Sequence, residues 1–210
     1  MGKVILDMSM SLDGFVTGPD DNIENPMGHG GERLHEWLFS GDTASDNRSA
    51  SVLPGRESFK TSAGSSEVLE EMFKKTGAVI MGRRWFDIGE KPWGDDPPFH
   101  VPVFVITHHI REKITKGETT FTFVTEGIVS ALKQAKAAAR KKNVSVGAAK
   151  IAQQFLKEGL LDEIHIHLVP VLLGDGRRLF HYIGKKKIEL EKISVIDSPG
   201  VTHIKFRVLK

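Results

Sequence analysis

The sequence contains no cysteine among its 210 residues. This absence excludes disulfide frameworks, thiolate metal sites and a cysteine nucleophile, and it is typical of a reducing compartment, so we expect a cytoplasmic protein. No run approaches the roughly 18 apolar residues that a membrane span requires. The chain reaches the acidic Asp7 too soon for the apolar region of a signal peptide. We therefore expect neither a secreted protein nor a membrane partner.

A large excess of charge is missing as well, because 29 Lys and Arg face 27 Asp and Glu, a net charge of +2. This balance does not indicate nucleic acid as a partner. The short basic clusters at residues 140–142 and 185–187 are interpreted as a solvated helix end and a turn. A hydrophobic content of 40% can form one sizeable core. We expect a single domain over residues 1–210, although the length also fits two small domains.

Apolar runs and turn signals predict the strands, and helical periodicity predicts four helices between them. The strands are expected at 4–9, 78–81, 103–106, 121–124, 144–146, 163–169, 188–196 and 201–209, and the helices at 32–39, 66–75, 128–142 and 149–158. We expect Ser65 or Ser66 to cap the second helix and Gly159 to end the fourth. The alternation predicts an α/β fold, with a mostly parallel central sheet of about eight strands and flanking helices. The last two strands flank Asp197–Gly200 and should form an antiparallel hairpin.

One long stretch, residues 41–64, is rich in Ser, Gly, Asp and Asn and has no clear periodicity. Loops of this length are either functional lids or disordered insertions. The sequence leaves both interpretations open.

A possible phosphate site follows the predicted strand 144–146, where Gly147-Ala148-Ala149-Lys150 opens a helix. Ligands of open α/β sheets bind at the carboxyl ends of strands, where helix N-termini present free N–H groups. Small residues let a phosphate approach the backbone, and Lys150 would add charge. The alternative is tight packing of helix on sheet. The segment is not a G-x-G-x-x-G fingerprint, and the chain has no Walker A motif.

A second junction, Gly82-Arg83-Arg84-Trp85, follows the buried strand 78–81. Two arginines at the carboxyl end of a strand suit a phosphate monoester, which they can bind through planar forks of donors. The alternative is a pair of surface arginines stacked on aromatic rings. Thr107 ends a third buried strand. Two such junctions in one sheet, beside this third strand end, would rarely arise by accident and favour a site for a phosphate-bearing ligand.

The order of motifs resembles a known family. Met10–Phe15, Val79–Arg84 and Pro102–Thr107 are similar to the dihydrofolate-reductase-like superfamily, and the closing stretches Gly159–Ile164 and Val169–Gly176 resemble one of its branches. That branch contains the C-terminal reductase domain of bifunctional riboflavin-biosynthesis deaminase-reductases. The resemblance covers nearly the whole chain except residues 41–64. It implies a dihydrofolate-reductase-like fold, NADPH as hydride donor and a homodimer.

The resemblance also implies a place for each part of the cofactor. Arg83 and Arg84 would hold the 2′-phosphate of NADPH, with Gly82, Trp85, Thr107 and His108 beside it. The pyrophosphate would lie on Gly147, Ala148, Ala149, Lys150, Ile151 and Ala152. The stretch Asp13–Gly18, which includes Val16, would pass over the nicotinamide and a small-molecule substrate. The implied reaction transfers a hydride to a C=N or C=O group of a small heterocycle, riboflavin-pathway-like or pterin-like.

Three departures from the family pattern bear on this assignment. Trp85 stands where the family has Thr or Ser, which removes a phosphate-binding hydroxyl. The paired glycines of the fourth motif become Gly147-Ala148, and in the family their peptide bond is often cis. The carboxylate that dihydrofolate reductases use to bind the pterin has no clean match, since none of Glu67, Glu70 and Glu71 aligns with it. Folate is therefore a doubtful substrate.

Asp13 is the candidate catalytic residue. A carboxylate there could hydrogen-bond an amino-heterocycle or relay a proton. The alternative is a structural turn, because Asp-Gly is a common turn pair.

Other functions compete with a reductase. His165 and His167 share a face of a predicted strand and could bind a metal, but no third ligand can be named, and we expect exposed histidines and no metal. The departures named above also leave open an NADP(H)-binding module without catalytic turnover. A metal-dependent hydrolase is a more distant alternative.

Overall fold

The structure of the protein is a computed structural model, and it describes residues 2–44 and 60–210. The lid or insertion expected at residues 41–64 falls mostly on residues 45–59, which lie outside this part of the chain. Two short strands at its margins, β2 (Thr43–Ala44) and β3 (Lys60–Thr61), pair antiparallel.

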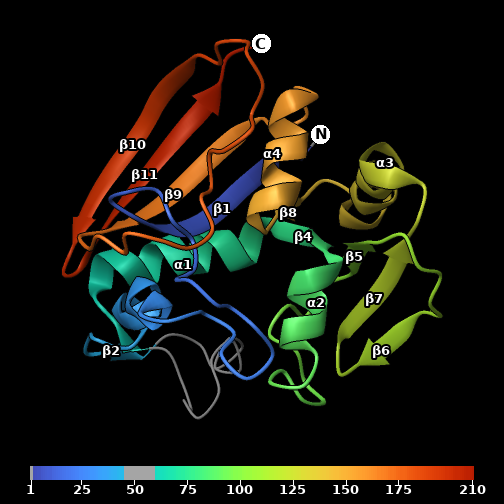
Figure 1. The fold of residues 1–210 in the computed structure, drawn as a ribbon, viewed down its shortest axis with the longest axis horizontal. Coiled ribbons are helices and arrows are strands. Elements are labelled where there is room, and N and C mark those ends of the chain that lie inside the picture. The colour runs from blue at the N-terminus through green and yellow to red at the C-terminus, as the bar shows by residue number, and fades with distance from the viewer. Residues whose placement is uncertain (1, 45–59) are drawn as a thin grey trace.

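Among the described residues, nine strands form one sheet in the order β10-β11-β9-β1-β8-β4-β5-β7-β6. The strands are β1 (Val4–Ser11), β4 (Thr76–Gly82), β5 (Val103–Ile106), β6 (Ile114–Lys116), β7 (Thr119–Val124), β8 (Asn143–Val146), β9 (Glu163–Val169), β10 (Leu190–Ser198) and β11 (Val201–Val208). The six strands from β9 to β7 in this order pair in parallel, and β10, β11 and β6 are antiparallel. The predicted α/β sheet and its C-terminal hairpin are therefore confirmed (Figure 1).

The helices are η1 (Gly31–Leu38), α1 (Ala63–Lys75), α2 (Arg83–Gly89), α3 (Gly127–Ala139) and α4 (Ala149–Lys157). Four of them match predicted helices, although η1 is a 3-10 helix. The predicted cap of α1 is wrong, because Ser62 accepts the hydrogen bond from the Ser65 N–H. Helix α2 was not predicted, because it has only seven residues and begins at Arg83, directly after the last residue of β4, with no turn between the two elements. Gly159 follows α4 with φ +63°, as expected of a helix-ending glycine.

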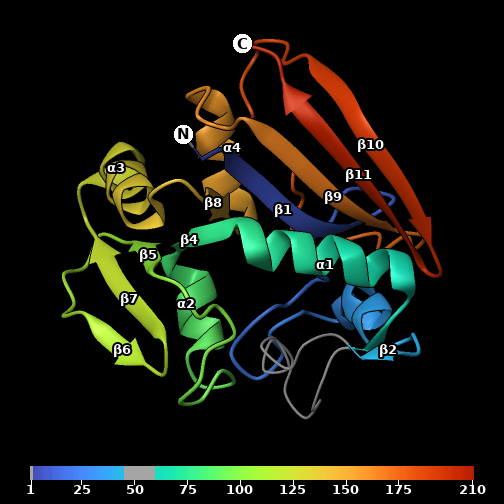
Figure 2. The same ribbon diagram turned by 180° about the vertical axis from the view of Figure 1, so that it is seen from behind.

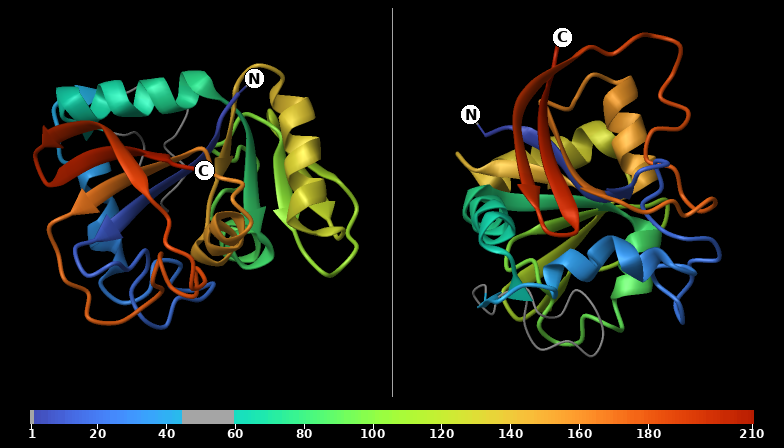
Figure 3. Two further views of the ribbon diagram at one scale, coloured as in Figure 1. Left: turned by 90° about the horizontal axis from the view of Figure 1, so that it is seen from above. Right: turned by 90° about the vertical axis from the view of Figure 1, so that its left-hand side faces the viewer.

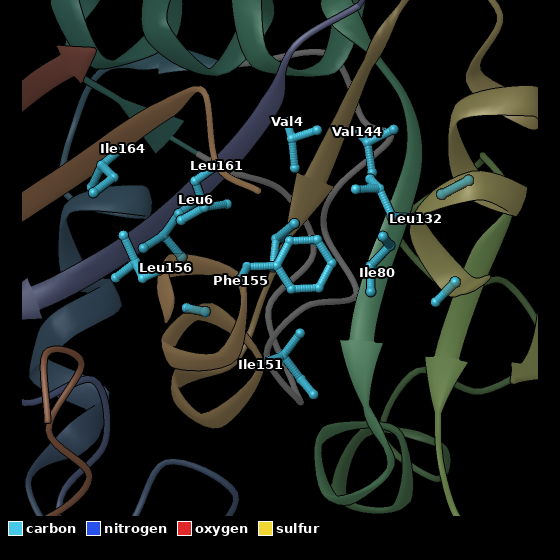
Figure 4. Packing of buried hydrophobic residues seen from close by; sticks show 14 of the residues in the cluster. Val4, Leu6, Ile80, Leu132, Val144, Ile151, Phe155, Leu156, Leu161 and Ile164 are labelled. Carbon is cyan, nitrogen blue, oxygen red and sulfur yellow. The ribbon is translucent and has the colours of Figure 1, made fainter. Parts of the chain in front are cut away.

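The helices lie on both faces of the sheet. Figure 3 shows α1 and α4 on opposite sides of it, and Figure 2 shows α1 running across the strands. Alternate residues of each central strand therefore enter different cores. Figure 4 shows Phe155 of α4 between Leu6 of β1 and Ile80 of β4, in the core that α3 and α4 cover. Burial of side chains of this size stabilises the fold by about 1.5–3 kcal/mol each.

The other face carries two smaller cores. Val79 and Met81 of β4 pack with Phe86 of α2, and Val169 of β9 packs with Trp37 of η1 and with α1. Because these two cores are separate, the sheet between them is not covered by a continuous layer of side chains. The candidate site lies on this face.

Candidate functional site

A cavity of about 1190 Å³ lies on the face of the sheet that carries α1, α2 and η1. Its floor contains Asp7 of β1, Val79 of β4 and Ser145 of β8. Its walls come from α2, η1, the N-terminus of α4 and the loops around residues 16–27, 92–101 and 176–182. It is one continuous space that is larger than most small-molecule pockets.

Most of the predicted cofactor residues line this cavity. They are Val16, Gly82, Arg83, Arg84, Trp85, Thr107, His108, Ala148, Ala149, Lys150 and Ile151. Ala152 does not, because it is fully buried in the core under α4. Gly147 does not line it either, because the ring of Trp85 covers it. The structure thus brings together the three strand ends that the sequence singled out.

The two glycine junctions lie side by side. The Gly147 N–H donates to the Ile80 carbonyl at 2.9 Å, which joins the end of β8 to β4. A methyl group added at Gly147 would lie 1.9 Å from Cζ3 of Trp85, and one added at Gly82 would lie 3.2 Å from Ile151. Trp85 therefore takes the room beside Gly147, and only a glycine fits beneath it.

Ala148 has φ +74° and ψ 135°, a backbone conformation that favours glycine. The described residues contain no cis peptide bond. Ala148 is the N-cap residue of α4, and its side chain makes no capping hydrogen bond. The first N–H groups of the helix therefore have no side-chain cap, which leaves them available to an anion.

The cations around this end of the cavity differ in their partners. Arg83 Nε donates to Asp87 Oδ1 at 2.5 Å within α2. Arg84 donates to the Asp21 carboxylate at 3.2 Å, and Arg177 donates to both oxygens of that carboxylate at 2.9 and 2.8 Å. Asp21 thus ties α2 to two loops.

Lys150 is exposed in the first turn of α4, and no ion pair of Lys150 occurs among the described residues. A cation at a helix N-terminus is electrostatically unfavourable. A bound anion would remove this penalty.

Thr107 is buried, and its Oγ1 accepts a hydrogen bond from the His109 N–H at 3.1 Å. This bond fixes the turn that follows β5. His108 in that turn is exposed at the cavity edge.

Asp13 lies outside the residues that line the cavity. Its carboxylate accepts hydrogen bonds from Ser11 Oγ at 2.6 Å and from the N–H groups of Leu173 and Gly174 at 3.2 and 2.7 Å. The bond from Ser11, aided by the two N–H groups, holds the pKa of Asp13 below its ordinary value. This geometry supports the turn interpretation, with the carboxylate anchoring the loop after β9, and the contact of Asp13 with a substrate stays a prediction.

Asp7 and the histidines of β9 were not connected with the predicted cofactor site from the sequence alone. In the structure Asp7 and His167 line the cavity. His165 and His167 share a face, as predicted, but they are not exposed, because both contact the Asp7 carboxylate. The signal was present in β1, where the polar residues Asp7, Ser9 and Ser11 alternate with apolar ones. No group of three or more His, Cys, Asp or Glu in the described part of the chain could hold a metal ion.

No helix in residues 2–44 and 60–210 is long and apolar enough to cross a membrane.

Two bacterial proteins resemble the chain over most of its length. YyaP of Bacillus subtilis (strain 168) is 22% identical over 210 residues, which cover 96% of this chain and 93% of YyaP. YwjB of the same organism is 25% identical over 192 residues, covering 85% and 83% of the two chains.

Solved structures share the fold. A putative riboflavin biosynthesis protein from Shewanella sp. PV-4 superposes with a TM-score of 0.68 at 20% identity, covering 99% of both chains. A pyrimidine reductase-like protein from Corynebacterium diphtheriae gives a TM-score of 0.53 at 14% identity, covering 100% of this chain and 92% of the other. A deaminase/5-amino-6-(5-phosphoribosylamino)uracil reductase from Thermotoga maritima gives 0.58 at 13% identity, and this chain spans 57% of its length.

The predicted resemblance is confirmed by a family model. The model described as the RibD C-terminal domain matches residues 2–202, nearly the whole chain. These residues include every strand end and loop that lines the cavity. The chain belongs to the RibD C-terminal domain family.

Proposed function

We propose that the protein is an NADPH-dependent reductase that transfers a hydride to a C=N or C=O group of a small heterocycle, in a riboflavin-pathway-like role. The observation that carries this proposal is the single cavity. It joins a cationic end, formed by α2 and the N-terminus of α4, to a floor that contains a buried carboxylate. One space can therefore take a dinucleotide and a small substrate together.

The residues at the cationic end fit a dinucleotide. The N-terminus of α4, which has no side-chain cap, and Lys150, which has no ion pair within residues 2–44 and 60–210, suit a pyrophosphate. Arg83 and Arg84 lie at the end of β4 and suit the 2′-phosphate, because a guanidinium binds a phosphate monoester through two parallel donors. Arg84 would exchange its contact with Asp21 for the phosphate, while Arg177 keeps that carboxylate paired. Thr107 and His108 lie beside them on the cavity wall.

When bound, NADPH supplies the hydride. The protein orients the ring and excludes water. Val16 is buried in the loop after β1 and gives the cavity an apolar wall. The aromatic rings of Trp85, Trp93 and Phe99 meet edge to face at 5.0–6.5 Å and close the space on the side of α2.

The cofactor assignment is tested by comparing NADPH with NADH in thermal shift and calorimetric titration. We expect NADPH to raise the melting temperature more than NADH does. The double variant Arg83→Ala/Arg84→Ala should lose most of this preference while keeping NADH binding. Asp87→Asn is the matched control, because it releases Arg83 from its ion pair without removing the guanidinium. Equal shifts from both cofactors would contradict the 2′-phosphate assignment.

Turnover is tested with ribosylaminopyrimidines, pterins and simple carbonyls as substrates, by following the loss of the absorbance of the reduced nicotinamide ring as NADPH is oxidised. We expect a ribosylaminopyrimidine to be reduced. Tight NADPH binding without turnover would instead support the binding module. The strained Ala148 and the Trp85 ring over Gly147 favour that second candidate, because both narrow the place where the pyrophosphate is expected.

We also propose a homodimer, as the family resemblance implies. Light scattering on a sizing column would test it, with a mass near twice 23.2 kDa expected. A monomeric mass at all concentrations would contradict it.

A further inference from the structure

A row of polar side chains crosses three neighbouring strands at the floor of the cavity. Asp7 of β1 is level with His165 of β9, and Ser9 of β1 is level with His167. His203 of β11 is in turn level with His167. Because residues that are level across a sheet point to the same face, these side chains form one cluster.

The cluster holds the Asp7 carboxylate in one orientation. Its Oδ1 lies 3.0 Å from His167 Nε2, and its Oδ2 lies 3.4 Å from His165 Nδ1. The His167 Nδ1 is 2.7 Å from His203 Nδ1, and His203 Nε2 is 2.9 Å from Ser65 Oγ at the start of α1. The carboxylate is therefore supported by a hydrogen-bonded chain that runs through His167 and His203 to Ser65 at the start of α1.

Asp7 keeps its charge although it is buried. Burial alone would raise the pKa of Asp7, but the charge of His167 and the hydrogen bonds from both histidines outweigh it and hold the pKa well below its ordinary value. Its Oδ1 is taken by His167, whereas the longer contact at Oδ2 leaves that oxygen able to accept further hydrogen bonds. An ionised carboxylate can only accept, so its natural ligand is an N–H or O–H donor.

Two more polar atoms of the cavity wall lack partners. The Nδ1 of His35 on η1 and the Oγ1 of Thr17 are buried, and neither finds a hydrogen-bond partner in the described part of the chain. Both residues line the same cavity as Asp7. Buried polar groups are nearly always paired with protein, water or ligand atoms, so these two atoms can accept a polar ligand that enters the cavity.

We propose that Asp7 is the specificity-determining carboxylate of the cavity. It accepts hydrogen bonds from an edge with two N–H donors, such as that of an amidine or a 2-amino-substituted nitrogen heterocycle. His167 is a positioning residue that holds Asp7 ionised and oriented, with His203 and Ser65 behind it. The identification of this ligand as the substrate rests on the proposed function. The binding of an edge with two N–H donors to Asp7 does not depend on that function.

The first test uses two probes of equal shape. The edge of 2-aminopyridine carries two N–H donors when the ring is protonated, and 2-methylpyridine lacks the amino group. Titration calorimetry should show at least a 10-fold preference of the wild type for 2-aminopyridine. Asp7→Asn should bind both probes with similar affinity, and Glu71→Gln should behave as the wild type. Glu71 is a suitable control because its carboxylate is also ion-paired but lies outside the cavity.

A second measurement needs no variant of Asp7. In protein with ¹⁵N-labelled histidine, 2-aminopyridine should shift the ring resonances of His165 and His167, and 2-methylpyridine should not. His167→Gln, which keeps a donor for Asp7, should retain most of the preference, and His167→Leu should lose it. This readout keeps the proposal testable if Asp7→Asn does not fold.

The proposal would be overturned if the wild type showed no preference for 2-aminopyridine over 2-methylpyridine. It would also be overturned if Asp7→Asn kept that preference. Binding of NADPH serves as the separate check on the proposed function. This check is made on the wild type, because Asp7 of β1 lies beside the end of β8, where Gly147 and Lys150 follow. If the wild type does not bind NADPH, the proposed reductase function is wrong. The role of Asp7 is then decided separately, by the preference for 2-aminopyridine over 2-methylpyridine.

Discussion

Acidification from pH 7 to pH 5 should destabilise the protein through two histidines of the cavity region. Burial, aided by the charge of His167, lowers the pKa of His35 to about 4 and that of His203 to about 4. In the unfolded chain both would titrate near the ordinary value of about 6.5. Between these two values the unfolded state binds protons that the folded state does not, so the free energy of unfolding falls as the pH falls.

The size of the effect follows from the two pKa values. Each histidine should lower the free energy of unfolding by about 2 kcal/mol between pH 7 and pH 5, so the pair should lower it by about 4 kcal/mol. Carboxylates contribute little in this range, because unfolded Asp and Glu titrate near about 4. The depressed pKa of Asp7 therefore matters only in more acidic solution.

Urea unfolding at half-unit intervals of pH, followed by tryptophan fluorescence, measures this slope. His35→Gln and His203→Gln should each remove about half of the loss, because the neutral amide has no proton to gain. Glu71→Gln should leave the slope between pH 5 and 7 unchanged, since the pKa of Glu71 is lowered to about 2 by its hydrogen bonds to two lysines. A wild-type slope that is flat over this range would refute the neutral state of the two histidines.

Three further predictions concern the strand ends. Ala148→Gly should stabilise the protein by about 1 kcal/mol in urea unfolding, because relief of the positive φ exceeds the entropy cost of glycine. Gly147→Ala should destabilise it by about 1–3 kcal/mol through the clash with Trp85, and the loss should shrink in a Trp85→Leu background. Asp21→Asn should cost about 2 kcal/mol in the same assay, with smaller effect in 1 M salt, because it removes the partner of Arg177.

The central strands were predictable because they are buried on both faces. Val103–Ile106 and Ala78–Met81 are continuous apolar runs, and the structure places both in the parallel part of the sheet. Strand β6 was not predicted, because its three residues Ile114–Lys116 lie at the edge and carry only one apolar side chain. Hydrophobic patterns predict an element when its burial requires apolar residues at most positions. They fail for short elements at the edge of a sheet, because few positions there are buried.

The candidate cofactor site was predictable for a related reason. Parallel strands end at the same edge of a sheet, so the small and basic residues after β4, β5 and β8 had to lie near one another. The partners of those residues were not predictable. Asp21, which pairs with Arg84, comes from a loop more than 60 residues earlier in the chain, and no local pattern links the two.

The same limit explains why Asp7 was not placed at the site from the sequence. Spacing showed that His165 and His167 share a face. It could not show that η1 and α1 cover that face, because Trp37 and Ser65 lie 100 residues or more away in the sequence. None of the three glutamates of α1 that were compared with the carboxylate of dihydrofolate reductases lines the cavity, and α1 contributes Ser65 to the cluster instead. The buried carboxylate that does line the cavity, Asp7, lies on β1, where an acidic residue in an otherwise buried strand needs partners to stay charged. A buried charge on a central strand is therefore better evidence for a binding site than a surface carboxylate on a helix, because only the former requires other residues to support it.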